Sequence, residues 1–450
     1  MNPTVLLVPF GDRYYPTDLQ QSLIDRCSQM LKALDVDLRV APTVKVIDDS
    51  PAAARFAEEA CADLTVALIA TWMEPPNFFA ALDPVLHKPL LLWSLVMYPN
   101  PEDRKEMLTL GGFVAAATLR ETLEEMDVRH KFIWGMPEDP GTRSAVASYA
   151  RVALARRRMR ETRVGLFGYA ALGIYTATFD AVSLRRKIGP EIHHIDQWLL
   201  IKRMEEVAAD QAEAIADELA RDWKLGPGVT RQELVKAGRM AAALRDLAAE
   251  NHLDAINIKC HYELSEIYQF TACVPISILS RDIVCSCEGD MFATMSQLML
   301  HYLTDNQTVY GDIHEVFPPD RLTIACCGFN PVGMCDPNCR MISRWASDFQ
   351  GIMNSSPYQT DQRVTLARMA AKGEDYKLHL TTGKTVKTFN WHEINCPPPP
   401  ATDVILDDDP IWFARNIASN HYAMVFGDVR QEMIDLAGLL GVRVVATGTQ

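Results

Sequence analysis

Unbroken apolar runs recur along the N-terminal part of this chain, and segments with helical spacing separate them. Residues 5–8, 65–69, 90–93 and 131–134 are runs of this kind, and a helical segment, 119–126, precedes the last of them. Strands that are buried on both faces of a parallel sheet have this continuous apolar character. Their alternation with helices predicts an α/β domain whose sheet is covered on both sides.

The same opening pattern returns near residue 161, where an apolar run ends at Gly168. A chain of 450 residues is too long for one hydrophobic core, so we predict that a second α/β domain begins there. Its strands are predicted at residues 254–259 and 282–287, followed by a helix over 291–303. Neither Gly11 nor Gly168 belongs to a complete dinucleotide-binding or Walker motif, which argues against nucleotide binding.

The pattern changes after about residue 325, where polar and apolar residues alternate as in β-strands. Residues 376–380 and 385–389 flank Gly383-Lys384, which predicts a hairpin. A strand at 421–426, a helix at 431–440 and a strand at 442–445 follow. The predicted fold is therefore two Rossmann-like parallel-sheet domains, residues 1–160 and 161–325, followed by a β-rich C-terminal domain, residues 326–450.

The charge balance argues against two classes of partner. The chain has 44 Lys and Arg against 58 Asp and Glu, a formal net charge of −14. Proteins that bind nucleic acid or anionic membranes present basic faces, so neither partner is expected. No secretion signal is visible at the first residues, and the apolar runs are too short to cross a bilayer. We expect a cytoplasmic protein.

The cysteines are unevenly distributed. Cys285, Cys287, Cys326, Cys327 and Cys335 lie with Cys339 in one region, and the chain has 11 cysteines in all. Structural zinc sites usually show regularly spaced Cys-x2-Cys pairs, whereas these intervals are irregular, and an odd total suits reduced thiols. We interpret these residues as buried thiols, with a second metal site as the alternative.

Two carboxylates occupy positions that suit chemistry. Glu288 falls between a predicted strand and the next helix, which is the edge where open α/β sheets place their ligands. Residues 309–313 resemble a neighbouring strand, which would put Asp312 near a similar edge. With His421, which would reach them across a domain interface, these side chains form the donor set of a hard divalent cation.

Three segments resemble the L-fucose isomerase family: Cys287-Glu288-Gly289-Asp290, residues 309–312 and residues 420–428. L-arabinose isomerase shares the first. The resemblance implies that Glu288, Asp312 and His421 ligate Mn²⁺ or another divalent cation. It also implies that Glu288 and Asp312 are the catalytic acid/base pair and that the protein is a homo-oligomer, a hexamer in the family.

The implied reaction is aldose–ketose isomerisation through a cis-enediolate. A proton moves between C1 and C2 of the sugar while the two oxygens exchange carbonyl character. A cation that chelates both oxygens stabilises the negative charge that develops on them. One carboxylate then carries the carbon-bound proton and the other the hydroxyl proton.

Further substrate contacts rest on weaker likenesses. The predicted substrate-binding residues are Trp391, Asn420, Glu263, Lys259, Arg13 and Trp72. Trp391 would stack on the sugar or, equally, pack between the hairpin and the sheet. Glu263 would act as an acid in the reaction or, equally, be a surface carboxylate. In the family, Arg13 and Trp72 would reach substrate from a neighbouring subunit.

The substrate itself is expected to be a monosaccharide, and it could carry an anionic group such as a sulfonate or phosphate. The candidate anion-binding residues are Lys259, Arg281, Arg340 and Arg344. Two alternatives to the isomerase remain open. One is a non-catalytic sugar-binding or regulatory protein, and the other is a metal-dependent aldolase or epimerase.

Overall fold

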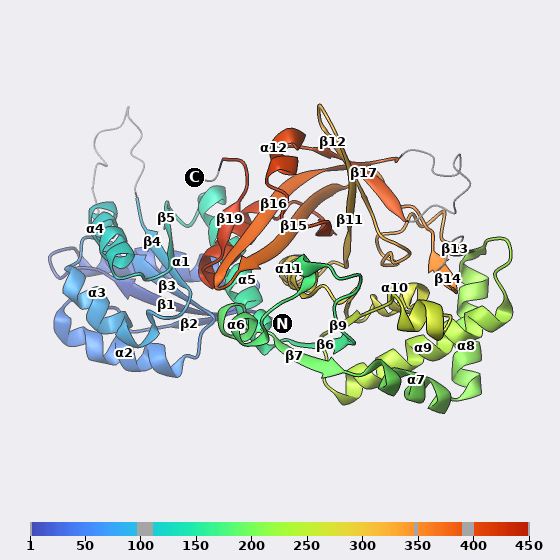
Figure 1. Cartoon of the computed structure of the whole chain (residues 1–450). Helices are drawn as coiled ribbons and strands as arrows, with labels where there is room; N and C mark the ends of the chain where they lie inside the picture. The colour runs from blue at the N-terminus through green and yellow to red at the C-terminus, as the bar shows by residue number, and fades with distance from the viewer. Residues whose placement is uncertain (1, 97–110, 346–349, 389–399, 449–450) are drawn as a thin grey trace. The chain divides into compact units, whose positions relative to one another are not determined.

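The computed structural model describes residues 2–96, 111–345, 350–388 and 400–448. These residues form two compact units, Met1–Arg157 and Arg158–Gln450. The helix α5 (Pro140–Glu161) contains the border between them. Each unit has its own sheet structure (Figure 1).

The first unit is a five-stranded parallel sheet with the strand order β2-β1-β3-β4-β5. Its strands are β1 (Thr4–Phe10), β2 (Asp37–Val40), β3 (Leu64–Ile69), β4 (Leu90–Ser94) and β5 (His130–Trp134). Its helices besides α5 are α1 (Thr17–Lys32), α2 (Ser50–Glu59), α3 (Pro75–Leu82) and α4 (Gly112–Glu125), with 3-10 turns at Ile47–Asp49 and Asp83–Val85. The four predicted strands are confirmed, and every residue of β3 and β4 is buried, as their unbroken apolar sequences require.

The second unit contains another parallel sheet, with the order β10-β9-β6-β7. Its strands are β6 (Arg163–Phe167), β7 (Glu191–Ile195), β9 (Ala255–Ile258) and β10 (Val284–Cys287). The accompanying helices are α6 (Ala181–Lys187), α7 (Gln197–Glu206), α8 (Ala209–Asp222), α9 (Arg231–Glu250) and α10 (Cys273–Leu279), with a 3-10 turn at Tyr175–Ala177 and a π-helical turn at Glu263–Ile267. The predicted α/β class is confirmed.

A closed antiparallel barrel completes the second unit. Its strands are β11 (Thr308–Phe317), β12 (Arg321–Ala325), β15 (Arg363–Lys372), β16 (Asp375–Val386), β17 (Ala401–Leu406) and β18 (His421–Phe426). The barrel closes because β15 pairs with β18 on one side and with β16 on the other. The strand β19 (Arg443–Val445) adds to β16, and the helices α12 (Pro410–Arg415) and α13 (Arg430–Leu440) follow β17 and β18.

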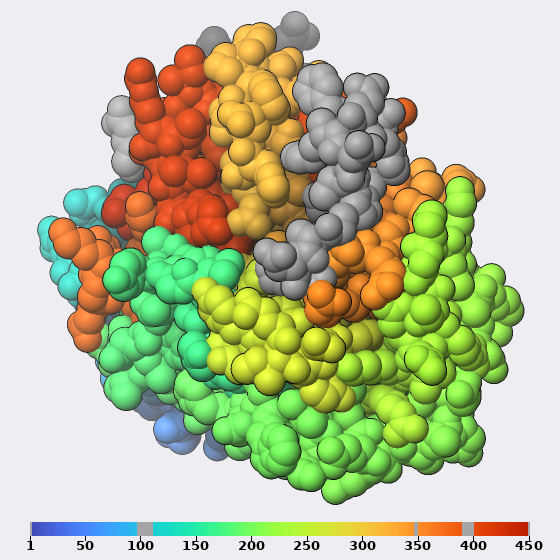
Figure 2. Space-filling model, turned by 45° about the vertical axis from the view of Figure 1, so that its right-hand side comes forward, coloured from blue at the N-terminus to red at the C-terminus, as the bar shows by residue number. Residues whose placement is uncertain are grey.

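One helix joins the two layers of the second unit. The helix α11 (Met291–Thr304) contacts β9 and β10 of the sheet and β11, β15 and β18 of the barrel. Almost every residue of α11 is buried, which agrees with its apolar character on all sides. The space-filling view shows the barrel strands, in orange and red, above the sheet layer, in green and yellow (Figure 2). A small sheet of β8 (Lys224–Leu225), β13 (Met341–Arg344) and β14 (Ile352–Asn354) lies beside them.

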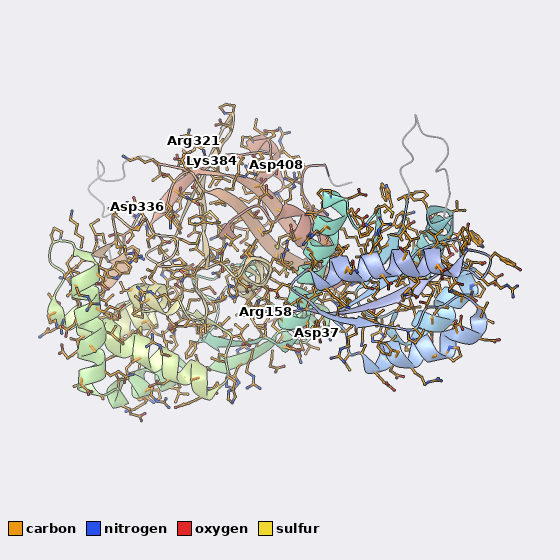
Figure 3. All side chains as sticks on the ribbon, turned by 180° about the vertical axis from the view of Figure 1, so that it is seen from behind. Asp37, Arg158, Arg321, Asp336, Lys384 and Asp408 are labelled. Atoms are coloured by element: carbon orange, nitrogen blue, oxygen red, sulfur yellow. The ribbon has the colours of Figure 1, made fainter. Side chains whose placement is uncertain are left out.

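Two local predictions are wrong. The strand that carries Asp312, β11, is not a neighbour in the parallel sheet but runs antiparallel between β12 and β18 in the barrel. Gly383-Lys384 is not a turn, because both residues lie inside the continuous strand β16, and Lys384 is labelled on the barrel in Figure 3. The turn lies at Gly373, where φ is +59°. Gly383 instead permits close pairing, since a Cβ there would be 2.3 Å from the Ile405 carbonyl oxygen.

Within the described residues, no helix has both the length and the apolar character needed to cross a membrane.

Candidate metal centre

Glu288 sits on a strained turn that directly follows β10. Its φ is +65°, a left-handed conformation that costs a residue with a side chain about 1–2 kcal/mol. Hydrogen bonds hold it in place: Glu288 N donates to the Ile258 carbonyl (2.9 Å), and the Glu288 carbonyl accepts from Ala171 N (2.8 Å). Gly289 N donates to the buried Asn257 side chain (2.8 Å). The strain aims the Glu288 carboxylate at the barrel, and a strained residue of this kind is typical of functional sites.

Asp312 and His421 are brought together by strand pairing. They face each other across β11 and β18, where Asp312 pairs with His421 in the antiparallel register. Directly opposed residues on adjacent strands have side chains close enough to act on one ligand. The barrel thus supplies two of the three predicted metal ligands, and the turn after β10 supplies the third.

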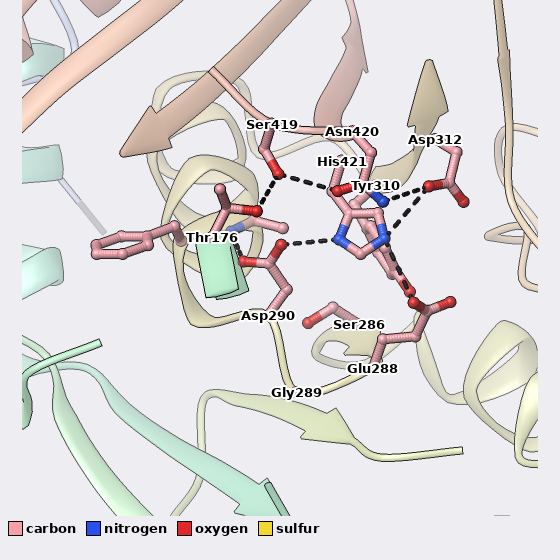
Figure 4. A network of polar contacts seen from close by, with 12 residues as sticks. Thr176, Ser286, Glu288, Gly289, Asp290, Tyr310, Asp312, Ser419, Asn420 and His421 are labelled. Carbon is pink, nitrogen blue, oxygen red and sulfur yellow. Dashed lines mark hydrogen bonds and ion pairs between the residues drawn. The ribbon is translucent and has the colours of Figure 1, made fainter. Parts of the chain in front are cut away.

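The three side chains converge on the imidazole nitrogen Nε2 of His421. This atom lies 3.4 Å from Glu288 Oε2 and 3.4 Å from Asp312 Oδ1 (Figure 4). It is buried and makes no hydrogen bond of good geometry. One donor atom from each residue lies within 4.8 Å of the others, so a single ion could bind all three. Two carboxylates and one imidazole suit Mn²⁺ or a similar divalent cation.

Asp290 contacts the other imidazole nitrogen of His421, and Arg368 contacts Asp290. The sequence patterns did not single out either as a site residue. Asp290 Oδ2 lies 2.7 Å from His421 Nδ1 and accepts a hydrogen bond from Arg368 Nη1 (2.7 Å). Both side chains are fully buried. A carboxylate on Nδ1 keeps the proton there and leaves Nε2 for a cation. The signal available in the sequence was the position of Asp290 as the N-cap of α11.

Charge interactions fix the protonation of the metal-free site. Burial disfavours the charged form of His421, but its interactions with the carboxylates of Asp290 and Glu288 outweigh burial and raise the His421 pKa to about 10. Burial likewise opposes ionisation of Glu288, but interactions with His261 and His421 hold its pKa below the ordinary value. Both shifts favour the charged forms of these two side chains, so a cation would bind Nε2 in place of a proton.

The second oxygen of Glu288 faces other residues. Oε1 lies 3.3 Å from His261 Nε2 and accepts a hydrogen bond from Cys327 Sγ (3.5 Å). Cys287 Sγ lies nearby on β10 and contacts the Tyr310 hydroxyl (2.8 Å). The ten described cysteines form no disulfide, and most of them are buried.

Some of the predicted substrate-binding residues of the second unit lie near this centre. Asn420 donates its side-chain amide to Asp312 Oδ1 (2.7 Å), so it orients a predicted ligand. Lys259 is buried after β9, forms an ion pair with Glu263, and lies 3.6 Å above the ring of Tyr169. Glu263 is 45% exposed.

The other predicted residues are placed elsewhere. Arg281 pairs with Glu218 on α8 (2.8 Å), and Arg344 pairs with Glu233 on α9 (3.2 Å). Arg340 is half-buried before β13. Arg281 and Arg344 therefore pair with carboxylates on helices.

Arg13 and Trp72 belong to the first unit. Arg13 donates to the Tyr14 hydroxyl (3.0 Å), and Trp72 packs against the core of that unit. Trp391 lies outside the described residues.

The fold and the converging ligands define an α/β protein with a candidate divalent-cation site between a parallel sheet and a barrel. No family model matches the chain. The chain is similar to proteins named sulfoquinovose isomerase. The one from Alkalicoccus urumqiensis is 22% identical over 459 residues, which cover 98% of this chain and 99% of that protein. The one from Priestia aryabhattai is 20% identical over 462 residues, 98% of each chain. The one from Clostridium sp. (strain MSTE9) is 22% identical over 363 residues, 78% of this chain and 79% of that protein.

Proposed function

We propose that this protein is an aldose–ketose isomerase that acts on a sulfonated hexose and uses Mn²⁺ or a similar divalent cation. The observation that carries the proposal is the convergence of Glu288, Asp312 and His421 from three separate segments onto one point. The relatives named sulfoquinovose isomerase match nearly the whole length of the chain, which supports the same reaction class.

The cation would be held by Glu288, Asp312 and His421 and would polarise the oxygens on C1 and C2 of the sugar. Asp312 is 26% exposed, so it is the ligand that an entering sugar meets first, while Glu288 and His421 are enclosed. The two carboxylates carry the protons of the reaction, one between C1 and C2 and the other between the hydroxyls. Asn420 holds Asp312 in position for this transfer.

Lys259 is the candidate contact for the sulfonate. It is a buried cation two residues before His261 in the chain, and its present partner is the half-exposed carboxylate of Glu263. A sulfonate and a carboxylate are both oxyanions with a single negative charge, so the substrate group can take the place of Glu263 on Lys259. The hypothesis predicts that a neutral hexose of the same shape binds more weakly.

The test uses the metal-loaded protein with sulfoquinovose and with glucose, followed by nuclear magnetic resonance in deuterated water. With sulfoquinovose we expect a ketose that carries deuterium at C1 and a recovered aldose that carries deuterium at C2, and with glucose a much lower kcat/KM. Asp312→Asn should lower kcat by about 10²–10⁴-fold, while Asp320→Asn, an exposed carboxylate at the turn after β11, should not. Lys259→Met should raise KM for sulfoquinovose more than for glucose.

Four results would reject all or part of the proposal. Binding without deuterium exchange indicates a sugar-binding protein. Exchange that inverts C2 without forming a ketose indicates an epimerase, and carbon–carbon cleavage indicates an aldolase. Equal turnover of sulfoquinovose and glucose would reject the preference for an anionic substrate but not the isomerase activity.

A further inference from the structure

The Glu288 carboxylate has two separate donor environments. Its Oε2 faces His421, whereas its Oε1 faces His261 Nε2 at 3.3 Å and Cys327 Sγ at 3.5 Å. Nitrogen, oxygen and sulfur donors from these residues lie within 4.8 Å of one another. The site proposed for isomerisation uses neither His261 nor Cys327.

The two distances from Glu288 Oε1 match those around a tetrahedral ion. Zinc binds carboxylate oxygen and imidazole nitrogen at about 2.0–2.1 Å and thiolate sulfur at about 2.3 Å. At tetrahedral angles these bond lengths place the oxygen and nitrogen about 3.3 Å apart and the oxygen and sulfur about 3.5 Å apart. The two distances to Glu288 Oε1 are 3.3 and 3.5 Å.

The three residues are also fixed in place by the fold. His261 lies three residues after β9, Glu288 directly after β10, and Cys327 two residues after β12, so each lies close to the end of a strand. The side chains of His261 and Glu288 are 5% and 3% exposed, which limits their rotation. A site built on strand ends needs little rearrangement to receive an ion.

We propose that His261, Glu288 and Cys327 form a second cation site that takes Zn²⁺ or a similar thiophilic divalent ion. A thiolate, an imidazole and a carboxylate make a softer donor set than Glu288, Asp312 and His421, so the two sites differ in ion preference. On binding, the Cys327 thiol releases its proton to solvent and its sulfur bonds to the ion. Glu288 then bridges the two sites through opposite oxygens.

A neighbouring group of residues is an alternative site for the same ion. Donor atoms of Cys260, Cys287 and Glu288 also lie within 4.8 Å of one another. Cys287 Sγ, however, is already engaged with the Tyr310 hydroxyl (2.8 Å) in the buried core. Cys327 is only partly buried and reaches the carboxylate directly, which favours the site that contains it.

Cobalt titration tests the proposal without any substrate. Co²⁺ is added to the metal-free, reduced protein, and the absorption spectrum is recorded. Tetrahedral coordination with a thiolate gives an intense sulfur-to-cobalt charge-transfer band, and Zn²⁺ should then abolish it by displacement. We expect one equivalent of this signal in the wild-type protein.

Matched variants identify the ligands. Cys327→Ser and His261→Gln should each weaken Co²⁺ binding at this site at least tenfold, and Cys327→Ser should remove the charge-transfer band. Asp312→Asn should keep the band, because Asp312 belongs only to the other site. Cys339→Ser, at an exposed cysteine, is the control for substitution itself.

Two outcomes overturn the proposal. One is the absence of a charge-transfer band in the wild-type protein at millimolar Co²⁺. The other is a band that survives Cys327→Ser and disappears in Cys260→Ser, which assigns the thiolate to the competing group. Circular dichroism of each variant shows whether it is folded. Because the readout is spectroscopic, the isomerase proposal can fail while this site stands, and the reverse also holds.

Discussion

Replacing Asp290 by asparagine tests whether its carboxylate orients His421 in the candidate metal centre. Asparagine keeps the shape and the helix-capping oxygen of Asp290, which accepts from Ala293 N (3.0 Å), but it removes the negative charge. His421 then loses the carboxylate that holds its Nδ1 proton, and Arg368 loses its buried ion-pair partner at 2.7 Å. We therefore expect two separate effects, one on cation affinity and one on folding stability.

The structure sets the size of both effects. Removing a carboxylate that orients a metal-binding histidine weakens cation affinity by about 10–100-fold, or about 1.4–2.8 kcal/mol. Removing one partner of a buried ion pair costs about 3–5 kcal/mol, because the other charge is left uncompensated. Arg368 and Asp290 are both fully buried, so solvent does not screen this loss.

Isothermal calorimetry with Mn²⁺ measures the first effect, and denaturant unfolding in the presence of a chelator measures the second. Asp409→Asn is the matched control, since Asp409 also caps a helix through a backbone amide (2.9 Å) but lies at the exposed start of α12. An Asp290→Asn protein that binds Mn²⁺ within about threefold of the wild-type affinity would refute the proposed support role.

Two further predictions concern pH and the turn after β10. The His421 pKa of about 10 in the folded protein lies above its unfolded value, so its stabilisation is complete below about pH 6.5 and is lost as the pH rises towards 10. Thermal unfolding in chelator should therefore show falling stability over this range, and a rise would contradict the assigned contacts. Gly289→Ala should destabilise the protein by more than Gly373→Ala in denaturant unfolding. Both glycines have positive φ, but a Cβ at Gly289 would lie 2.3 Å from the Tyr169 carbonyl oxygen, whereas the space at Gly373 is open. Equal losses would show that the close approach is not limiting.

Local sequence patterns predicted the parts of the structure that depend on neighbouring residues. The apolar runs identified the parallel strands, and the strand-to-helix junction identified the position of Glu288. The pairing of β11 was not predictable, because an apolar run does not specify whether its neighbour is parallel or antiparallel. The turn predicted at Gly383 was wrong for a similar reason. Close approach of a neighbouring strand, here β17, and a tight turn both favour glycine, so the residue type alone does not distinguish them.

The remaining site residues depend on contacts between distant segments. Arg368 comes from the middle of β15 and carries no motif, yet it meets Asp290 in the core. Spacing along the chain cannot reveal such a pair. The sequence also could not predict that the second Glu288 oxygen faces Cys327. The irregularly spaced cysteines indicated only that a second metal site was an alternative in this region.

The position of the candidate metal centre has a consequence for how the polypeptide is held together. Asp290, two residues after Glu288, and His421 are 131 positions apart in the chain, so an ion shared by Glu288 and His421 would reversibly link two distant stretches of the chain. An ion that binds only the folded form stabilises that form by its own binding free energy. Resistance to proteolysis should then follow the supply of metal in the surroundings.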